Sequence, residues 1–373
     1  MWSSRRCSRL IRSLSAVALA LFLFAGLSVP QTKSLPPTPA KGPDSTPQAP
    51  ETILTLRASP TTNLQSEMGG VFSSAKCDAD GNLYIRKFAM DRPLLGPVAK
   101  IDPDGKRVAL FDPAAFSQLA LDRSDSFSPA SDGGIYRIAQ IGVSNPQIYV
   151  LHFGSDGAPS SATRLDADLE VYTFAAFADG NFLVSGTKRD LNNKNDRGRN
   201  FTAVFSADGR ELAQISFEKP HEVEAVGTKA EAKGGQKQPS KEADKAAPML
   251  DLADAEVGSD GYLYVLRSSS PALVYAISSS GKIMKTLKVA APAADAAPVA
   301  FHVSGNRMAV SFWSHKSQMV VVEDAQTGEK IATYEGPGEL GNLFTCYSAN
   351  EGVFTFLKLG EANELGVVRA KAQ

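Results

Sequence analysis

The sequence lacks the short motifs that usually mark an enzyme. No Gly-x-Ser-x-Gly, Cys-x-x-Cys or His-x-x-x-His pattern occurs in its 373 residues. The sequence therefore gives no support to serine-hydrolase, thiol-redox or zinc-protease chemistry. The four histidines are scattered, and a lone histidine of this kind is more often a structural or surface residue than a catalytic one. They are His152, His221, His302 and His315.

Long apolar runs are also missing. The one clear run, from Leu14 to Leu27, is shorter than the roughly 20 residues that a membrane span needs. Four arginines precede this run, and the small residues Gly26 and Ser28 stand at its end. This order of basic, apolar and small residues predicts a signal peptide over 1–28. We therefore expect an exported protein, periplasmic or extracellular, that keeps no stable membrane span after cleavage.

The chain has little excess charge of either sign. Removing the leader takes away four of the 39 basic residues and none of the 40 acidic ones, which leaves 35 against 40. A mildly acidic surface does not favour the binding of a phosphate backbone, so nucleic acid is not expected as a partner. Residues 29–50 are rich in proline and have almost nothing apolar to bury, which predicts a disordered tether before the folded domain at 51–373.

Cysteine is scarce as well. Cys7 leaves with the leader, so the mature chain keeps only Cys77 and Cys346. An oxidising compartment permits one disulfide between these two residues. Each of them could equally be a small buried residue with a free thiol.

A short phrase recurs along the rest of the chain. It begins as "DADGNLYI" at 78–85 and returns as "SDGGIYRI" at 131–138, "ADGNFLVSG" at 178–186 and "SDGYLYVLR" at 259–267, with weaker copies at 303–312 and 349–357. Asp-Gly between alternating apolar residues predicts a β-hairpin, because glycine accepts the positive φ that such turns need. The first copy does not fit a helix–loop–helix calcium site, because Leu83 stands at the sixth position, where glycine is required, and a strand pattern follows. We interpret its aspartates as residues that cap the turn.

Each copy is followed by a second hairpin, so the repeat unit is four antiparallel strands. Six such units predict an all-β fold, a six-bladed β-propeller. The sixth unit has no chain left for its fourth strand. We expect residues 51–59 to supply that strand by pairing with 363–371, which removes an exposed sheet edge. The segment 219–249 has balanced charges and no aromatic residue, which predicts a disordered insertion.

The phrases "DADGNLYI" and "IDPDGK" resemble the NHL-repeat branch of the six-bladed propellers, whose superfamily also includes the gluconolactonase-like enzymes. The resemblance covers residues 51–373 and implies the fold more than a function, since propellers host many unrelated activities. It leaves three functions open. The first is a monomeric, non-catalytic propeller that binds a protein, peptide or glycan. The second is a metal-dependent lactonase or lyase, and the third is a structural scaffold of the cell envelope.

Loops on one face of such a propeller are the expected ligand site, because loops on a rigid scaffold often carry binding groups. The loop at 187–200 concentrates basic and amide side chains, including Arg189 and Arg197. The loop at 313–318 carries Trp313 and His315, which could stack on a ligand and hydrogen-bond to it.

A second candidate site lies nine residues before the repeated turns. Equivalent repeat positions form a ring, and the polar residues at this one are Arg123, Glu170, Asp251, Asp295 and Asn342. Oxygen ligands of this kind suit a divalent cation such as calcium, and His302 on an inner strand could add a nitrogen ligand. We expect these residues near the mouth of the central channel. Solvated polar loop residues are the alternative interpretation.

Overall fold

The computed structural model describes residues 53–373 except 65–71, 90, 144–145, 167–168, 189–197, 216–249, 253, 316, 338–339, 342 and 361–364. The predicted signal peptide (1–28), the predicted tether (29–50) and the predicted disordered insertion (219–249) all lie outside the described residues. Within this part of the chain the regular structure is almost entirely β-strand, and two short 3-10 helices, η1 (Pro93–Leu95) and η2 (Pro113–Ala115), complete it. None of the described helices is long and apolar enough to cross a membrane.

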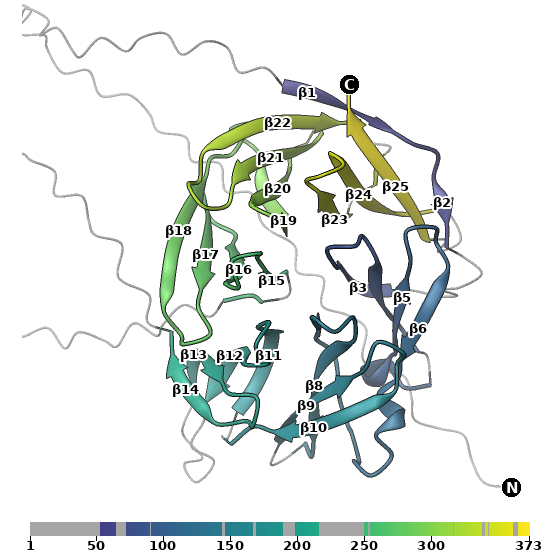
Figure 1. The fold of residues 1–373 in the computed structure, drawn as a ribbon, viewed down its shortest axis with the longest axis vertical. Helices are drawn as coiled ribbons and strands as arrows, with labels where there is room; N and C mark the ends of the chain where they lie inside the picture. The colour runs from purple at the N-terminus through teal and green to yellow at the C-terminus, as the bar shows by residue number, and fades with distance from the viewer. Residues whose placement is uncertain are drawn as a thin grey trace, which may run out of the picture. The chain divides into compact units, whose positions relative to one another are not determined.

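Four sheets have four antiparallel strands each, and their strands follow one another along the chain (Figure 1). The first contains β3 (Phe72–Cys77), β4 (Leu83–Lys87), β5 (Val98–Ile101) and β6 (Arg107–Phe111). The second contains β7 (Phe127–Pro129), β8 (Ile135–Ile141), β9 (Gln147–Phe153) and β10 (Pro159–Arg164). The third contains β11 (Leu169–Ala176), β12 (Phe182–Lys188), β13 (Arg199–Phe205) and β14 (Glu211–Gln214). The fourth contains β15 (Glu256–Val257), β16 (Leu263–Arg267), β17 (Ala272–Ile277) and β18 (Ile283–Val289).

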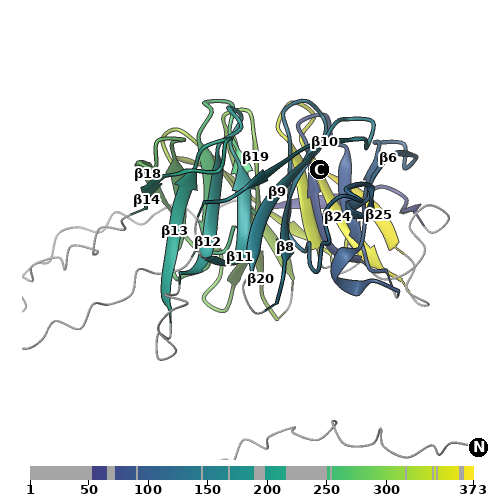
Figure 2. The same ribbon diagram turned by 90° about the horizontal axis from the view of Figure 1, so that it is seen from below.

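The remaining strands form one nine-stranded sheet. It contains β19 (Ala297–Ser304), β20 (Arg307–Trp313), β21 (Gln318–Asp324), β22 (Lys330–Gly336), β23 (Leu343–Ser348), β24 (Val353–Leu359) and β25 (Leu365–Ala372), together with the N-terminal β1 (Ile53–Ala58) and β2 (Thr62–Asn63). The sheets of residues 53–373 follow one another around a centre, with β3, β11, β15, β19 and β23 toward the inside and β1 at the outside, which is a propeller-like arrangement (Figure 1). Seen from the side, the strands run between the two faces of this arrangement (Figure 2).

The N-terminal strand pairs with the C-terminal one, as the sequence predicts. In β1, residues 56–58 pair antiparallel with residues 370–372 of β25, and β2 pairs with residues 366–367 of the same strand. The first half of β1 also makes a pairing that the sequence does not predict. Its residues 53–55 run parallel to residues 333–335 of β22. Through this second pairing β1 joins the last two groups of strands into one sheet, where the sequence analysis expects two separate sheets.

The repeated Asp-Gly phrase forms the predicted turns between the first and second strands. In the first turn the Asp78 carboxylate accepts hydrogen bonds from the backbone N–H groups of Asp80 and Asn82, at 3.1 and 3.0 Å. Gly81 has φ +79°, in the left-handed region that glycine enters without strain. The Tyr84 hydroxyl also donates to Asp78. The interpretation of Asp78 as a turn-capping residue is therefore confirmed.

The core lies between neighbouring sheets. One cluster joins buried residues of β16–β18 to those of β19–β21, and another joins β11–β13 to β8 and β9. Apolar residues of the first sheet pack against those of the C-terminal strands, with Leu64, Ile85 and Leu357 among them. The same cluster contains Cys77, the last residue of β3, and Cys346 on β23, so this packing positions both cysteines.

Candidate functional site

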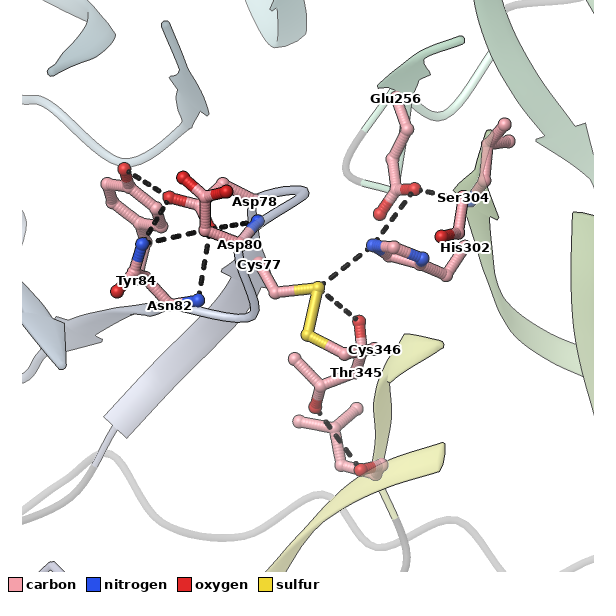
Figure 3. Close-up of a disulfide and its surroundings, with 12 residues drawn as sticks. Cys77, Asp78, Asp80, Asn82, Tyr84, Glu256, His302, Ser304, Thr345 and Cys346 are labelled. Carbon is pink, nitrogen blue, oxygen red and sulfur yellow. Dashed lines mark hydrogen bonds and ion pairs between the residues drawn. A yellow bond between two sulfur atoms is a disulfide. The ribbon is translucent and has the colours of Figure 1, made fainter. Parts of the chain in front are cut away.

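Four innermost strands bring a buried polar cluster together (Figure 3). Cys77 is the last residue of β3, Glu256 opens β15, His302 lies on β19 and Cys346 lies on β23. Cys77 and Cys346 are joined by a disulfide, with their Cα atoms 5.9 Å apart. The residues of this disulfide are 269 positions apart in the sequence, so only the arrangement of the sheets makes them neighbours.

The imidazole of His302 connects the sulfur atoms to a carboxylate. Its Nε2 atom lies 2.9 Å from Cys77 Sγ and 3.6 Å from Glu256 Oε2. The backbone N–H of Val303 donates to the same Glu256 oxygen at 2.7 Å and so fixes its position. Burial lowers the pKa of His302 to about 4, so the imidazole is neutral at physiological pH. A neutral imidazole keeps a lone pair with which it can accept a proton or bind a metal.

Charged groups surround this cluster on one side. Lys76 is buried, and its Nζ donates to the backbone carbonyl of Ala255 at 3.4 Å. Burial lowers the pKa of Lys76, while the charges of Asp254, Glu256 and Asp251 oppose that change. Burial also raises the pKa of Glu256 well above its ordinary value, although the Val303 N–H and Lys76 favour its ionised form. Strongly shifted groups that gather in this way are typical of functional sites and also of structural ion-pair networks.

A metal centre is one chemical possibility for the cluster. Among the described residues, Cys77, His302 and Cys346 are the one group of three or more potential ligand residues whose ligand atoms lie within 4.8 Å of one another. The carboxylates that the sequence suggests for a calcium site are not part of this group. The available donors are sulfur and nitrogen, which suit zinc or copper better than calcium.

The residues of the predicted ring are spread over the described structure. Arg123 is exposed and makes an ion pair with Asp125, and its backbone forms an isolated bridge to Gln140. Glu170 is partly buried on β11. Asp251 and Asp295 are exposed, and of the ring residues only Asp251 has a described electrostatic influence on the central cluster, through Lys76. Asn342 lies outside the described residues.

The predicted ligand loops are described in part. Trp313 ends β20 with 43% of its surface exposed, and His315 follows it in an exposed bend. Arg189 and Arg197 lie outside the described residues. His302, predicted as a nitrogen ligand, lies in the central cluster beside Glu256, and of the carboxylates proposed as its companions Asp251 acts on this cluster through Lys76.

Several exposed apolar side chains lie at the same face as Trp313, spread over different parts of the arrangement. In each repeated unit, the loop between the second and third strands and the start of the first strand lie at one face. Large exposed apolar residues at these positions are Phe88, Leu94, Val143, Tyr172, Val299, Trp313 and Leu359. We call this surface the loop face. The hydroxyl of Tyr172 lies 3.3 Å from Thr187 Oγ1 at the end of β12, which fixes the tyrosine ring at this surface.

A small cleft of about 20 Å³, partly open to solvent, lies on the loop face between the second and third sheets. Arg123 and Asp125 provide charge at its wall, and Ile138, Val171 and Tyr172 provide apolar surface. Arg86, which is buried, also donates to Asp125 at 3.1 Å, so this carboxylate is held between two arginines. The cleft therefore combines an aromatic ring with a fixed set of charges.

Sequence reasoning misses Lys76, Asp254 and Glu256. Lys76 immediately precedes Cys77, and a lysine on a strand that is otherwise buried is a signal that could have been used. Asp254 and Glu256 lie in the same segment as the predicted Asp251, closer to the turn. The candidate ring contains only the residue nine positions before each turn, which in this segment is Asp251, so it includes neither Asp254 nor Glu256.

Comparisons with known proteins give a likeness of fold only. No family model and no curated protein matches the chain. A protein from Bacteroides fragilis described as exported covers 85% of this chain and 95% of its own, with 11% identity and a TM-score of 0.47. A luciferin-regenerating enzyme covers 84% and 95%, with 11% identity and a TM-score of 0.45. The WD40 domain of Neurospora crassa Pan2 covers 85% and 94%, with 11% identity and a TM-score of 0.42. With such identities and TM-scores, none of these likenesses assigns a function to this chain.

Proposed function

We propose that this chain is an exported, non-catalytic β-propeller that binds a protein, peptide or glycan through its loop face. The observation that carries the proposal is the exposure of large apolar side chains on that face. Trp313 and Tyr172 are 43% and 42% exposed there. Tryptophan, tyrosine and arginine are enriched among the residues that contribute most to binding, and rigid aromatic rings lose little entropy when they bind.

The cleft beside Tyr172 supports the same proposal. Arg123 and Asp125 lie at its wall and can hydrogen-bond to the polar groups of a peptide or a sugar, while Tyr172 offers a flat ring for stacking. Concave surfaces with a few fixed polar groups and apolar walls are the usual form of a ligand site. The cleft of about 20 Å³ has room for little more than one water molecule, so it would take one polar group of a larger ligand that lies across the loop face.

The proposed architecture has six blades. The nine-stranded sheet is interpreted as two blades, one of β19–β22 and one of β23–β25 completed by the N-terminal strand, which are joined because β1 pairs with both β22 and β25. The resemblance of "DADGNLYI" to NHL repeats supports this number. The leader and the proline-rich segment would deliver the propeller across the inner membrane and tether it there or release it.

An array of peptides and glycans tests the binding function. The wild-type chain should bind a defined subset, and the variant Tyr172→Ala/Trp313→Ala should lose it. A matched control is Leu212→Ala/Met284→Ala, because these two side chains are 52% and 47% exposed but lie on outer strands away from the loop face. The proposal fails if no member of the array binds, or if the control and the loop-face variant lose binding equally.

A further inference from the structure

The cluster of Cys77, Cys346, His302 and Glu256 has a composition that the binding function does not use. Two sulfur atoms and one imidazole nitrogen lie within 4.8 Å of one another, and all three side chains are buried. A carboxylate oxygen of Glu256 lies 3.6 Å from the same imidazole nitrogen. These four side chains come from four different inner strands, so the architecture holds them in place without any one loop.

Two thiolates, one imidazole and one carboxylate match the preferences of zinc. Zinc in proteins takes four ligands in a tetrahedron, with sulfur at about 2.3 Å and nitrogen at about 2.0 Å. The backbone N–H of Val303 holds Glu256 Oε2 beside His302 Nε2, as neighbouring hydrogen bonds commonly orient metal ligands. The disulfide and the metal compete for the same sulfur atoms, because only free thiolates bind zinc.

The charge of the surroundings favours the cation. Once the metal has displaced the ligand protons, two thiolates and the Glu256 carboxylate place three negative charges next to one buried lysine, Lys76. A divalent cation brings the total charge of this group to zero, which matters because uncompensated charges are costly in a protein interior. Asp251 and Asp254, both exposed, add further negative charge that acts on Lys76.

We propose that the reduced protein binds one zinc-like divalent cation through Cys77, Cys346 and His302, with Glu256 as the fourth ligand, and that thiol–disulfide exchange with an oxidised dithiol, which is itself reduced to two thiols, re-forms the disulfide and empties the site. The reducing partner is a dithiol. It transfers two electrons and two protons to the disulfide, becomes a disulfide itself and leaves two cysteine thiols. The metal then displaces the two thiol protons, which are released to solvent. This inference does not depend on ligand binding at the loop face.

The test compares the full chain in its two redox states, with zinc and cobalt alone as probes. Oxidised protein and protein reduced by dithiothreitol, then freed of reductant without air, are each titrated with metal. The reduced form should bind one zinc per chain, release two protons, and give the absorption of tetrahedral cobalt thiolate. The oxidised form should bind none at this site. Equal binding by both forms, or no stoichiometric binding by the reduced form, would overturn the proposal.

Amino-acid substitutions distinguish the proposed metal ligands from residues that do not bind the metal. His302→Ala should abolish the cobalt thiolate spectrum. Glu256→Gln removes the carboxylate ligand and should weaken zinc binding by at least about 10-fold, since even the loss of a group that only supports a ligand costs about that much. His315→Ala removes an exposed histidine from a loop and should change nothing. If His302→Ala binds cobalt with the wild-type spectrum, the assignment is wrong. If circular dichroism shows that His302→Ala does not fold, the comparison of metal binding by the oxidised and the reduced wild-type chain still tests the proposal.

Discussion

Leu56 is the residue through which the closure of the strands can be tested most cleanly. It lies on β1, is 2% exposed, and packs in a cluster that includes Phe344 and Phe354 of the C-terminal strands. Leu56→Ala removes three carbon atoms, which at about 0.8 kcal/mol each amounts to about 2.4 kcal/mol of lost burial. The cavity that remains raises the expected loss of unfolding free energy to about 3 kcal/mol, within the range of such core substitutions.

Thermal unfolding followed by circular dichroism measures this effect. For a folded region of about 320 residues, a loss of about 3 kcal/mol should lower Tm by roughly 4 °C. Arg57→Ala on the same strand is the matched control, because Arg57 is exposed and its loss should leave Tm unchanged. A variant chain that starts at residue 61 loses all of β1, including the bond from the Gln373 N–H to the Thr55 carbonyl, and should be destabilised further. If Leu56→Ala has the same Tm as the wild type, the packing of β1 against the C-terminal strands does not contribute to stability as proposed.

Three further outcomes are expected. Burial raises the pKa of Glu323 to about 7, so the folded chain holds this proton more tightly than the unfolded chain and loses stability as pH rises from about 4.5 through 7. The unfolding free energy of Glu323→Gln should therefore exceed that of the wild type by about 3 kcal/mol at pH 8 and equal it near pH 4. Glu329→Gln, at an exposed position, should show no such difference at either pH. Cys77→Ser should cost the oxidised protein roughly 2 to 4 kcal/mol in denaturant unfolding, and equal stability would show that no disulfide forms. Mass spectrometry of protein from the native host should find a chain that begins near residue 29, and an intact N-terminus would contradict export by a cleaved leader.

Local turn chemistry made much of the fold predictable. Asp-Gly pairs such as Asp80-Gly81 and Asp260-Gly261 place both hairpin turns and strand order, because the backbone there needs a positive φ that few residues accept. The pairing of the N-terminal strand with β25 followed from a missing strand in the last unit. The parallel pairing of β1 with β22 could not be predicted, because no turn connects the two strands and no local pattern encodes it.

The candidate site was predictable only in part. The closeness of Cys77 and Cys346 follows from closing a ring of repeats, and the structure places their Cα atoms 5.9 Å apart. The meeting of Lys76 with Ala255, across 179 residues, depends on the relative position of two sheets, which sequence periodicity does not specify. Among the described residues, the predicted carboxylates Glu170, Asp251 and Asp295 form no group of ligand atoms within 4.8 Å of one another, and their role in ligand binding stays a prediction.

Fluorescence of Trp313 tests binding at the loop face most directly. Trp2 and Trp313 are the only tryptophans, and the first lies in the predicted leader, so a chain beginning at residue 29 reports from the loop face alone. Titration with a ligand identified on the peptide or glycan array should shift the emission of Trp313 and saturate at the affinity measured by calorimetry. Binding that calorimetry detects while the emission of Trp313 stays unchanged, and that survives Tyr172→Ala/Trp313→Ala, would place the ligand elsewhere and contradict the proposed function.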